Sequence, residues 1–168
     1  MRNKTLLIIF CAASVLALWA VANTKPVSPY TVNVPYEYPY VPGTQEWIDL
    51  GSTSARRQAS QVPDELLQSM ATDALLQTVL DYPFLSDIYA FNTMKMGYEA
   101  VRKHCNSLRE FETRPDHMEV LSHYCQTNYS LSKKERTLED YMAEHLYCLY
   151  ASGALAYPSC QPELAMLL

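Results

Sequence analysis

Three cysteines in this sequence each have a histidine close by in the chain, and these pairs are the nearest approach to a chemical site. The pairs are His104 with Cys105, His123 with Cys125, and His145 with Cys148. Thiolate and imidazole groups are the usual ligands of structural zinc. On a helix, however, neighbours such as His104 and Cys105 point about 100° apart, so one ion cannot easily contact both. We therefore predict no metal site and no cofactor.

The cysteines instead fit a disulfide framework. Apart from Cys11 in the N-terminal apolar segment, they are Cys105, Cys125, Cys148 and Cys160. An even number of cysteines in an exported chain is typical of disulfides, and four cysteines allow three pairings. Cys105 and Cys125 fall on the apolar stripes of two predicted helices joined near Pro115, where antiparallel packing would bring them together. The sequence thus predicts one disulfide between Cys105 and Cys125 and another between Cys148 and Cys160.

No arrangement typical of nucleophilic catalysis occurs in the sequence. The Gly-x-Ser-x-Gly motif is missing, and Ser152-Gly153 follows a predicted helix where a strand would be needed. Cys125 and His123 are two residues apart, so on a helix they do not face each other. Other polar residues that resemble site residues are better explained as helix caps or structural surface groups: Asp81, Asp87, Asn92, Glu139, Asp140, Glu144, His123 and His145. We therefore predict no catalytic residue.

Residues 1–22 indicate export. A short basic start precedes an almost wholly apolar stretch over 6–21, and Ala20 and Ala22 provide the small residues that a signal peptidase needs. We predict cleavage after Ala22, so that the mature chain begins at Asn23 and is secreted, or held at the cell surface or in the periplasm. An uncleaved membrane anchor is the alternative, because the apolar stretch approaches the length that spans a bilayer.

Residues 23–43 form a segment rich in proline and tyrosine. Its prolines are Pro26, Pro29, Pro35, Pro39 and Pro42, and its tyrosines are Tyr30, Tyr36, Tyr38 and Tyr40. Proline excludes a helix and favours extended or polyproline backbone. The favoured interpretation is a spacer that is dispensable for folding. The alternative is an arm whose tyrosines pack in a groove of its own domain or of a partner.

Residues 44–168 predict an all-α domain, an irregular bundle of about six or seven short helices. Pro63 and the acidic residues after it suit the start of a helix. Thr72 is the predicted N-cap of a helix that ends near Asp81, before Pro83. Phe84, Ile88 and Phe91 have helical spacing and predict another helix directly after it.

The cleanest amphipathic pattern runs from Met94 to Leu108, with Tyr98, Val101 and Cys105 on the same apolar stripe. Two capping boxes are predicted after it, Thr113 with Asp116 and Thr137 with Asp140. The second precedes a long, largely apolar helix that Gly153 and Pro158 are expected to end.

The charge of the chain limits its partners. The formal net charge is −5 at neutral pH, and removal of a basic signal segment would make it more negative. An acidic surface argues against binding to nucleic acid or to anionic membranes, which require clustered lysine and arginine. The basic pairs are best interpreted as separate, solvated helix faces: Arg56-Arg57, Arg102-Lys103 and Lys133-Lys134.

Two stretches carry a resemblance to a known family: VPDELLQSMATDALLQTVLDYPFLSDIYAFN and GYEAVRKHCNSLREFETRPD. Residues 45–125 resemble a family of exported bacterial proteins of unknown activity. The resemblance consists of a pattern of apolar spacing together with Tyr82-Pro83, Phe91-Asn92 and Asn106. The resemblance implies export and an all-helical fold. It supplies no activity, substrate or catalytic residue.

The sequence therefore favours an exported binding or structural module, whose partner would be another exported protein or a cell-surface polymer. Contact with a membrane is expected only through the signal segment, if this is not cleaved. The alternative is an exported hydrolase or metal-dependent enzyme whose site is assembled from scattered residues. The lack of a nucleophile motif, an HExxH helix or a glycine-rich loop favours the binding module.

Overall fold

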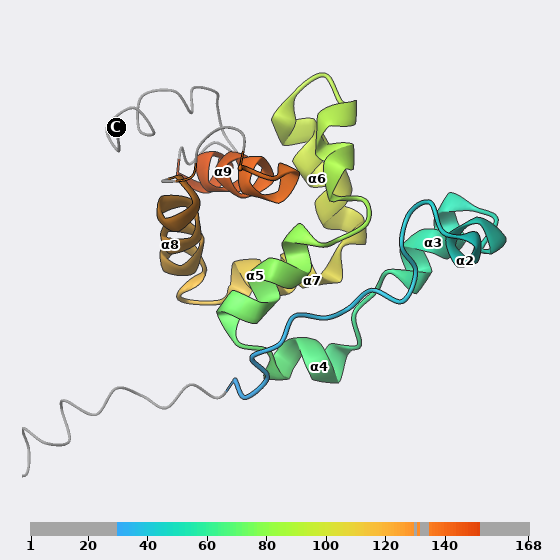
Figure 1. Ribbon diagram of the computed structural model, residues 1–168, viewed down its shortest axis with the longest axis horizontal. Helices are drawn as coiled ribbons and strands as arrows, with labels where there is room; N and C mark the ends of the chain where they lie inside the picture. The colour runs from blue at the N-terminus through green and yellow to red at the C-terminus, as the bar shows by residue number, and fades with distance from the viewer. Residues whose placement is uncertain (1–29, 130, 132–134, 152–168) are drawn as a thin grey trace, which may run out of the picture.

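The computed structural model describes residues 30–129, 131 and 135–151, which form an irregular bundle of short helices (Figure 1). In chain order the elements are α2 (Gln45–Asp49), α3 (Thr53–Ala59), α4 (Asp64–Ser69), α5 (Thr72–Leu80), the 3₁₀ helix η1 (Leu85–Ala90), α6 (Met94–His104), α7 (Asn106–Thr113), α8 (His117–Tyr129) and α9 (Leu138–Ala151). The described residues contain no β-strand, and the predicted all-α fold is confirmed.

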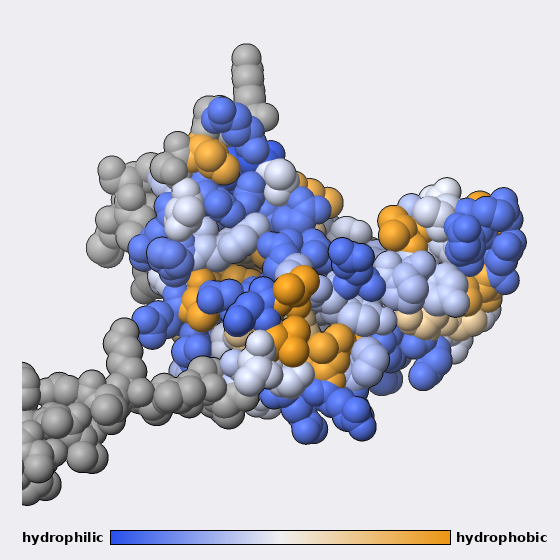
Figure 2. Space-filling view, turned by 60° about the horizontal axis from the view of Figure 1, so that its bottom comes forward, coloured by the Kyte–Doolittle hydropathy of each residue, from blue (hydrophilic) through white to orange (hydrophobic). Residues whose placement is uncertain are grey.

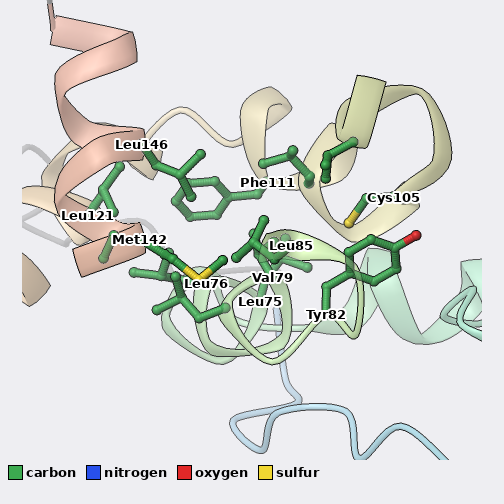
Figure 3. Packing of buried hydrophobic residues seen from close by; sticks show 14 of the residues in the cluster. Leu75, Leu76, Val79, Tyr82, Leu85, Cys105, Phe111, Leu121, Met142 and Leu146 are labelled. Carbon is green, nitrogen blue, oxygen red and sulfur yellow. The ribbon is translucent and has the colours of Figure 1, made fainter. Parts of the chain in front are cut away.

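Helix α5 lies at the centre of the bundle and is buried on nearly all sides. Seven of its nine residues are buried, and it packs against α7, α8 and α9. Figure 3 shows Leu75, Leu76 and Val79 of this helix facing Phe111 and Leu146 from its neighbours. An isolated helix of this length is not stable in water, so α5 forms because its packing stabilises it.

The predicted boundaries of α4 and α5 are nearly correct. Helix α4 begins after Pro63 with two acidic residues in its first turn, and α5 ends at Leu80 with Asp81 as its C-cap. Thr72 is not the N-cap of α5, however, because Ala71 takes that position. The Thr72 hydroxyl instead donates a hydrogen bond of 2.8 Å to the Asp116 carboxylate at the start of α8.

The hydrogen bond between Thr72 and Asp116 also explains why the capping box predicted for Thr113 and Asp116 is wrong. Thr113 is the last residue of α7, and its hydroxyl donates to the carbonyl of Glu110. The Asp116 carboxylate accepts its hydrogen bond from Thr72 and not from the backbone of Thr113.

The other predicted capping box, at the start of α9, is confirmed. The backbone N–H of Thr137 donates to the Asp140 carboxylate at 2.8 Å, and the N–H of Asp140 points back to the Thr137 hydroxyl at 3.4 Å.

The amphipathic pattern from Met94 to Leu108 is divided between two helices. Cys105 has an extended backbone conformation and separates α6 from α7, although it remains on the buried stripe. The break is stabilised by Asn106, whose side chain bonds to the backbone of Val62. The end of α6 therefore depends on a long-range contact, which the spacing of apolar residues in the sequence does not reveal.

The helix predicted over Phe84, Ile88 and Phe91 is the 3₁₀ helix η1, in which Ile88 is buried and Phe91 is 43% exposed. Helix α6 packs closely against it at Gly97. A Cβ atom at Gly97 would collide with the backbone of Ile88, so only glycine fits this approach.

The spacer interpretation is wrong for residues 30–38, because this part of the arm lies along the helical bundle (Figure 1). Val32 forms a parallel bridge with Met70, and its carbonyl accepts a 2.7 Å hydrogen bond from Ala71. The backbone N–H of Tyr36 donates to the Thr78 hydroxyl at 2.9 Å.

Two further tyrosines of the arm also contact the bundle. The Tyr38 hydroxyl donates to the Thr78 carbonyl at 3.1 Å, and the Tyr30 ring lies 3.6 Å from the Arg114 guanidinium. The described part of the proline segment forms no helix, as predicted, and Tyr36 and Tyr38 pack against the hydrophobic core.

The predicted disulfide between Cys105 and Cys125 is not formed, and both residues are buried free thiols. Cys105 lies beside Tyr82 at the α6–α7 junction (Figure 3), with its sulfur 3.2 Å from the Ser107 hydroxyl. Cys125 lies instead on α8, which packs against α9. Burial raises the pKa of Cys105 to about 11 and that of Cys125 to about 12, so both stay protonated.

Some predictions fall outside the described residues. They are the signal cleavage site at Ala20, Ala22 and Asn23, the start of the arm over residues 23–29, the helix stop at Gly153 and Pro158, and the pairing of Cys148 with Cys160.

The docked arm predicts a specific loss of stability. Tyr38→Ala should lower the free energy of unfolding by about 2 kcal/mol, because it removes a ring packed on the core and its hydroxyl bonds. Val34→Ala is the matched control, since Val34 is 66% exposed on the same arm and should change stability little. Urea denaturation measures both. Equal and negligible effects would show that the arm does not dock.

Candidate functional site

The polar residues singled out in the sequence are dispersed over the structure. Asp81 accepts a hydrogen bond from Gln77 within the last turn of α5, and Asp87 pairs with Arg57 at 3.5 Å. Asn92 is exposed between η1 and α6, and His123 is exposed on α8.

The histidine of α9 contacts another surface residue. The His145 ring lies 2.7 Å from the hydroxyl of Tyr89 in η1. These positions are those of caps and surface contacts, and the structure brings none of these residues into a common site with another.

A different set of residues comes together in a cleft of about 780 Å³ between α3 and the α6–α7 junction. Figure 2 shows α2 and α3 as a lobe set off from the rest of the molecule, and the cleft lies where α3 faces the bundle. Its lining residues are Thr53, Ser54, Arg57, Gln58, Gln61, Val62, Pro63, Asp64, Lys103, His104, Asn106 and Arg109.

Two side-chain amides fix the walls of this cleft. The amide of Gln61 donates to the carbonyls of Arg57 and His104, at 2.7 and 2.8 Å, and so joins α3 to α6. The Asn106 side chain donates to the Val62 carbonyl at 2.7 Å and accepts from the Val62 N–H at 3.1 Å. Val62 and Asn106 are 44 residues apart in the chain, so these hydrogen bonds hold together two distant segments that form the cleft.

The cleft concentrates positive charge. Arg57, Lys103 and Arg109 line it together with His104, and Asp64 is the one acidic residue in the described lining. The whole chain carries a formal charge of −5, so this surface has the opposite sign to the molecule.

Two of these cations are held in position by other groups. Arg109 Nη1 donates to the carbonyls of Arg102 and Lys103, at 2.9 and 3.1 Å, where α6 ends. The guanidinium carbon of Arg57 lies 5.5 Å from the centre of the Phe84 ring. The positive charges of Arg57 and Arg109 therefore belong to side chains with defined positions.

The titration of His104 is affected by this environment. Desolvation lowers the pKa of His104 below its ordinary value of 6.5, and the charges of Arg57, Lys103 and Arg109 lower it further. Near neutral pH the imidazole is therefore mostly neutral and the positive charge of the cleft comes from the other three residues.

The sequence did not reveal this site. Arg57 and Lys103 belong to basic pairs that suggested separate solvated faces, and they are far apart in the chain. The signal that connects them is the pairing of Asn106 with the backbone of Val62, which sequence periodicity cannot show. Asn106 was visible only as part of the family resemblance.

A second group of titratable side chains ties three helices together. The Tyr98 hydroxyl of α6 donates to the Glu112 carboxylate of α7, and Arg102 Nε donates to the other oxygen at 2.7 Å. The Tyr150 hydroxyl of α9 lies 3.4 Å from the same carboxylate. Desolvation raises the pKa of Glu112 to about 7. We assign this cluster a structural role, because every partner named belongs to the packing of α6, α7 and α9.

Two other kinds of site do not occur within the described part of the chain. No group of three or more His, Cys, Asp or Glu residues there is placed to hold a metal ion. None of the described helices is long and apolar enough to cross a membrane.

Comparisons with known proteins find no match to a family model, to a curated protein or to a solved structure. The resemblance noted over residues 45–125 gains no support from them.

The walls of the cleft depend on Asn106, which gives a direct test. Asn106→Ala should lower the free energy of unfolding by about 2 kcal/mol, because the N–H and C=O of buried Val62 lose their partner. Asn92→Ala, at an exposed asparagine, is the control and should be nearly neutral. Urea denaturation of both variants measures the difference. If the two losses were equal, Asn106 would not hold the cleft together.

Proposed function

We propose that this protein is an exported, non-catalytic module that binds an anionic ligand in the cleft between α3 and the α6–α7 junction. The observation that carries the proposal is the gathering of Arg57, Lys103 and Arg109 in one walled cleft of an acidic chain. Export rests on the basic and apolar pattern of residues 1–22 and is part of the proposal.

Electrostatics favours an anion at this position. Positive side chains that share a small volume repel one another, and each disfavours the charged form of its neighbours. Asp64 is the one carboxylate in the described lining, and Asp87 pairs with Arg57 from outside it, so these two carboxylates neutralise only part of the charge of the three cations. A negatively charged ligand would therefore gain attraction to three cations and relieve their repulsion.

The remaining lining suits polar recognition. The volume of about 780 Å³ lies within the range of small-ligand sites, which is roughly 300–1,000 Å³. Serine, threonine and glutamine side chains in the lining can donate hydrogen bonds to oxygen atoms of a ligand. The described lining includes no Phe, Tyr or Trp, so recognition would depend on charge and hydrogen bonds.

The overall acidity limits the length of the ligand. A long polyanion such as a nucleic acid would meet negative surface beyond the cleft and be repelled. A short segment or chain end of a negatively charged cell-surface polymer, or an acidic group on another exported protein, avoids this repulsion.

Binding to a sulfated oligosaccharide tests the proposal by isothermal titration calorimetry at low salt. Wild type should bind, and Lys103→Gln should bind about tenfold more weakly, because one ion contact of roughly 1.4 kcal/mol is lost. Lys95→Gln is the matched control, since Lys95 is an exposed lysine of the same helix outside the cleft. A neutral oligosaccharide of equal length should not bind.

Two results would contradict the proposal. The first is no measurable binding of the anionic probe, and the second is an equal loss in the two lysine variants. Hydrolysis of the probe that disappears in Asp64→Asn would instead favour the exported hydrolase.

A further inference from the structure

We propose that the cleft takes up its anionic ligand together with one proton, which binds to His104, so that acidic pH strengthens binding and alkaline pH favours release. The ligand class is a polyvalent oxyanion, such as a group bearing several sulfate or phosphate esters. This inference rests on the proposed function and adds a mode of regulation to the same site.

The position of His104 suits this role. Its carbonyl accepts hydrogen bonds from the Gln61 amide at 2.8 Å and from the Tyr82 hydroxyl at 3.2 Å, so its backbone is fixed at the end of α6. The imidazole lines the cleft and is partly exposed. Among the described residues neither ring nitrogen has a hydrogen-bond partner, so both are available to a ligand and a proton.

The charged groups around the cleft explain why the proton and the ligand bind together. Arg57 faces the cleft from α3, Lys103 from α6 and Arg109 from α7. The opposing carboxylates are Asp64 on α4 and Asp87 on η1, which pairs with Arg57 at 3.5 Å. Without a ligand, the positive charges of Arg57, Lys103 and Arg109 disfavour a fourth cation at His104, although Asp87 neutralises part of the charge of Arg57. A polyvalent anion reverses the sign of the local potential, so the protonated imidazole becomes favourable.

The size of the effect follows from linkage. A ligand that raises the pKa of a histidine must bind more tightly to the protonated protein, by up to about tenfold for each unit of the change. The affinity should fall as the pH rises through the range between the pKa of free His104, which lies below 6.5, and its higher pKa in the complex. Arginine and lysine side chains stay charged near neutral pH, so they cannot produce this pH dependence of the affinity.

The choice of ligand class depends on valence. A monovalent anion would be neutralised by one guanidinium and would leave the repulsion at His104 nearly unchanged. An anion with several charges can contact Arg57, Lys103 and Arg109 at once and still attract a proton. Sulfate esters are the best probe, because they stay ionised over the whole pH range, whereas phosphate monoesters titrate near pH 6.

The experiment measures binding of sucrose octasulfate at pH 5.5, 6.5 and 8 by calorimetry, using the full mature chain. Wild type should bind about tenfold more tightly at pH 5.5 than at pH 8. His104→Gln should bind with an affinity that changes less than about twofold over the same range. His123→Gln is the matched control, because His123 is an exposed histidine on α8 outside the cleft, and it should behave as wild type.

A second measurement gives the protonation directly. The carbon-bound imidazole protons of His104, followed by NMR, should show a pKa below 6.5 in the free protein and a higher one in the complex. Inorganic sulfate and dextran sulfate, compared with sucrose octasulfate, show whether the cleft takes free ions, chain segments or compact polyanions.

The outcomes separate this inference from the proposed function. Binding with equal affinity at all three pH values, or a pH dependence that persists in His104→Gln, would overturn proton uptake and leave anion binding intact. Absence of binding at every pH would overturn both.

Discussion

The burial of α5 is the constraint on which the other helices depend. None of the described helices is long enough to be securely stable in water by itself, and α5 offers apolar side chains in several directions. Each fully buried leucine or valine there contributes about 2 kcal/mol. Helices α7, α8 and α9 cover this surface directly, and the arm closes another side through bonds to Thr78. The arm is therefore part of the fold, and Tyr30 extends its contact to the buried Arg114.

The position of α7 against α5 also explains the cleft. Helix α7 begins where Cys105 interrupts the amphipathic run, and this break places Lys103, Arg109 and Asn106 at one corner of the bundle. Asn106 and Gln61 then hold the segment around Val62 and the end of α3 against that corner. The hydrogen bonds that maintain the fold at this junction thus also keep three cations together.

Much of the fold could be predicted because it follows local rules. The capping box before α9 and the end of α5 near Pro83 depend on neighbouring residues, and both were found from the sequence. The features that were missed depend on distant partners. Thr72 was expected to cap its own helix but bonds to Asp116, and the Cys105–Cys125 disulfide fails because the two helices bury their cysteines in different places. The candidate site is also a feature that depends on distant partners, because contacts around Val62 bring Arg57 close to Lys103.

The central claim is that these distant contacts build a site for an anion, and the most direct test is backbone NMR of the labelled protein titrated with a sulfated oligosaccharide. The account predicts that the amide signals with the largest saturable shifts belong to residues 53–64 and 103–109, the segments that line the cleft. Signals of α8, on another side of α5, should stay nearly constant. Shifts centred on α8 and α9, or spread evenly over the surface, would contradict it.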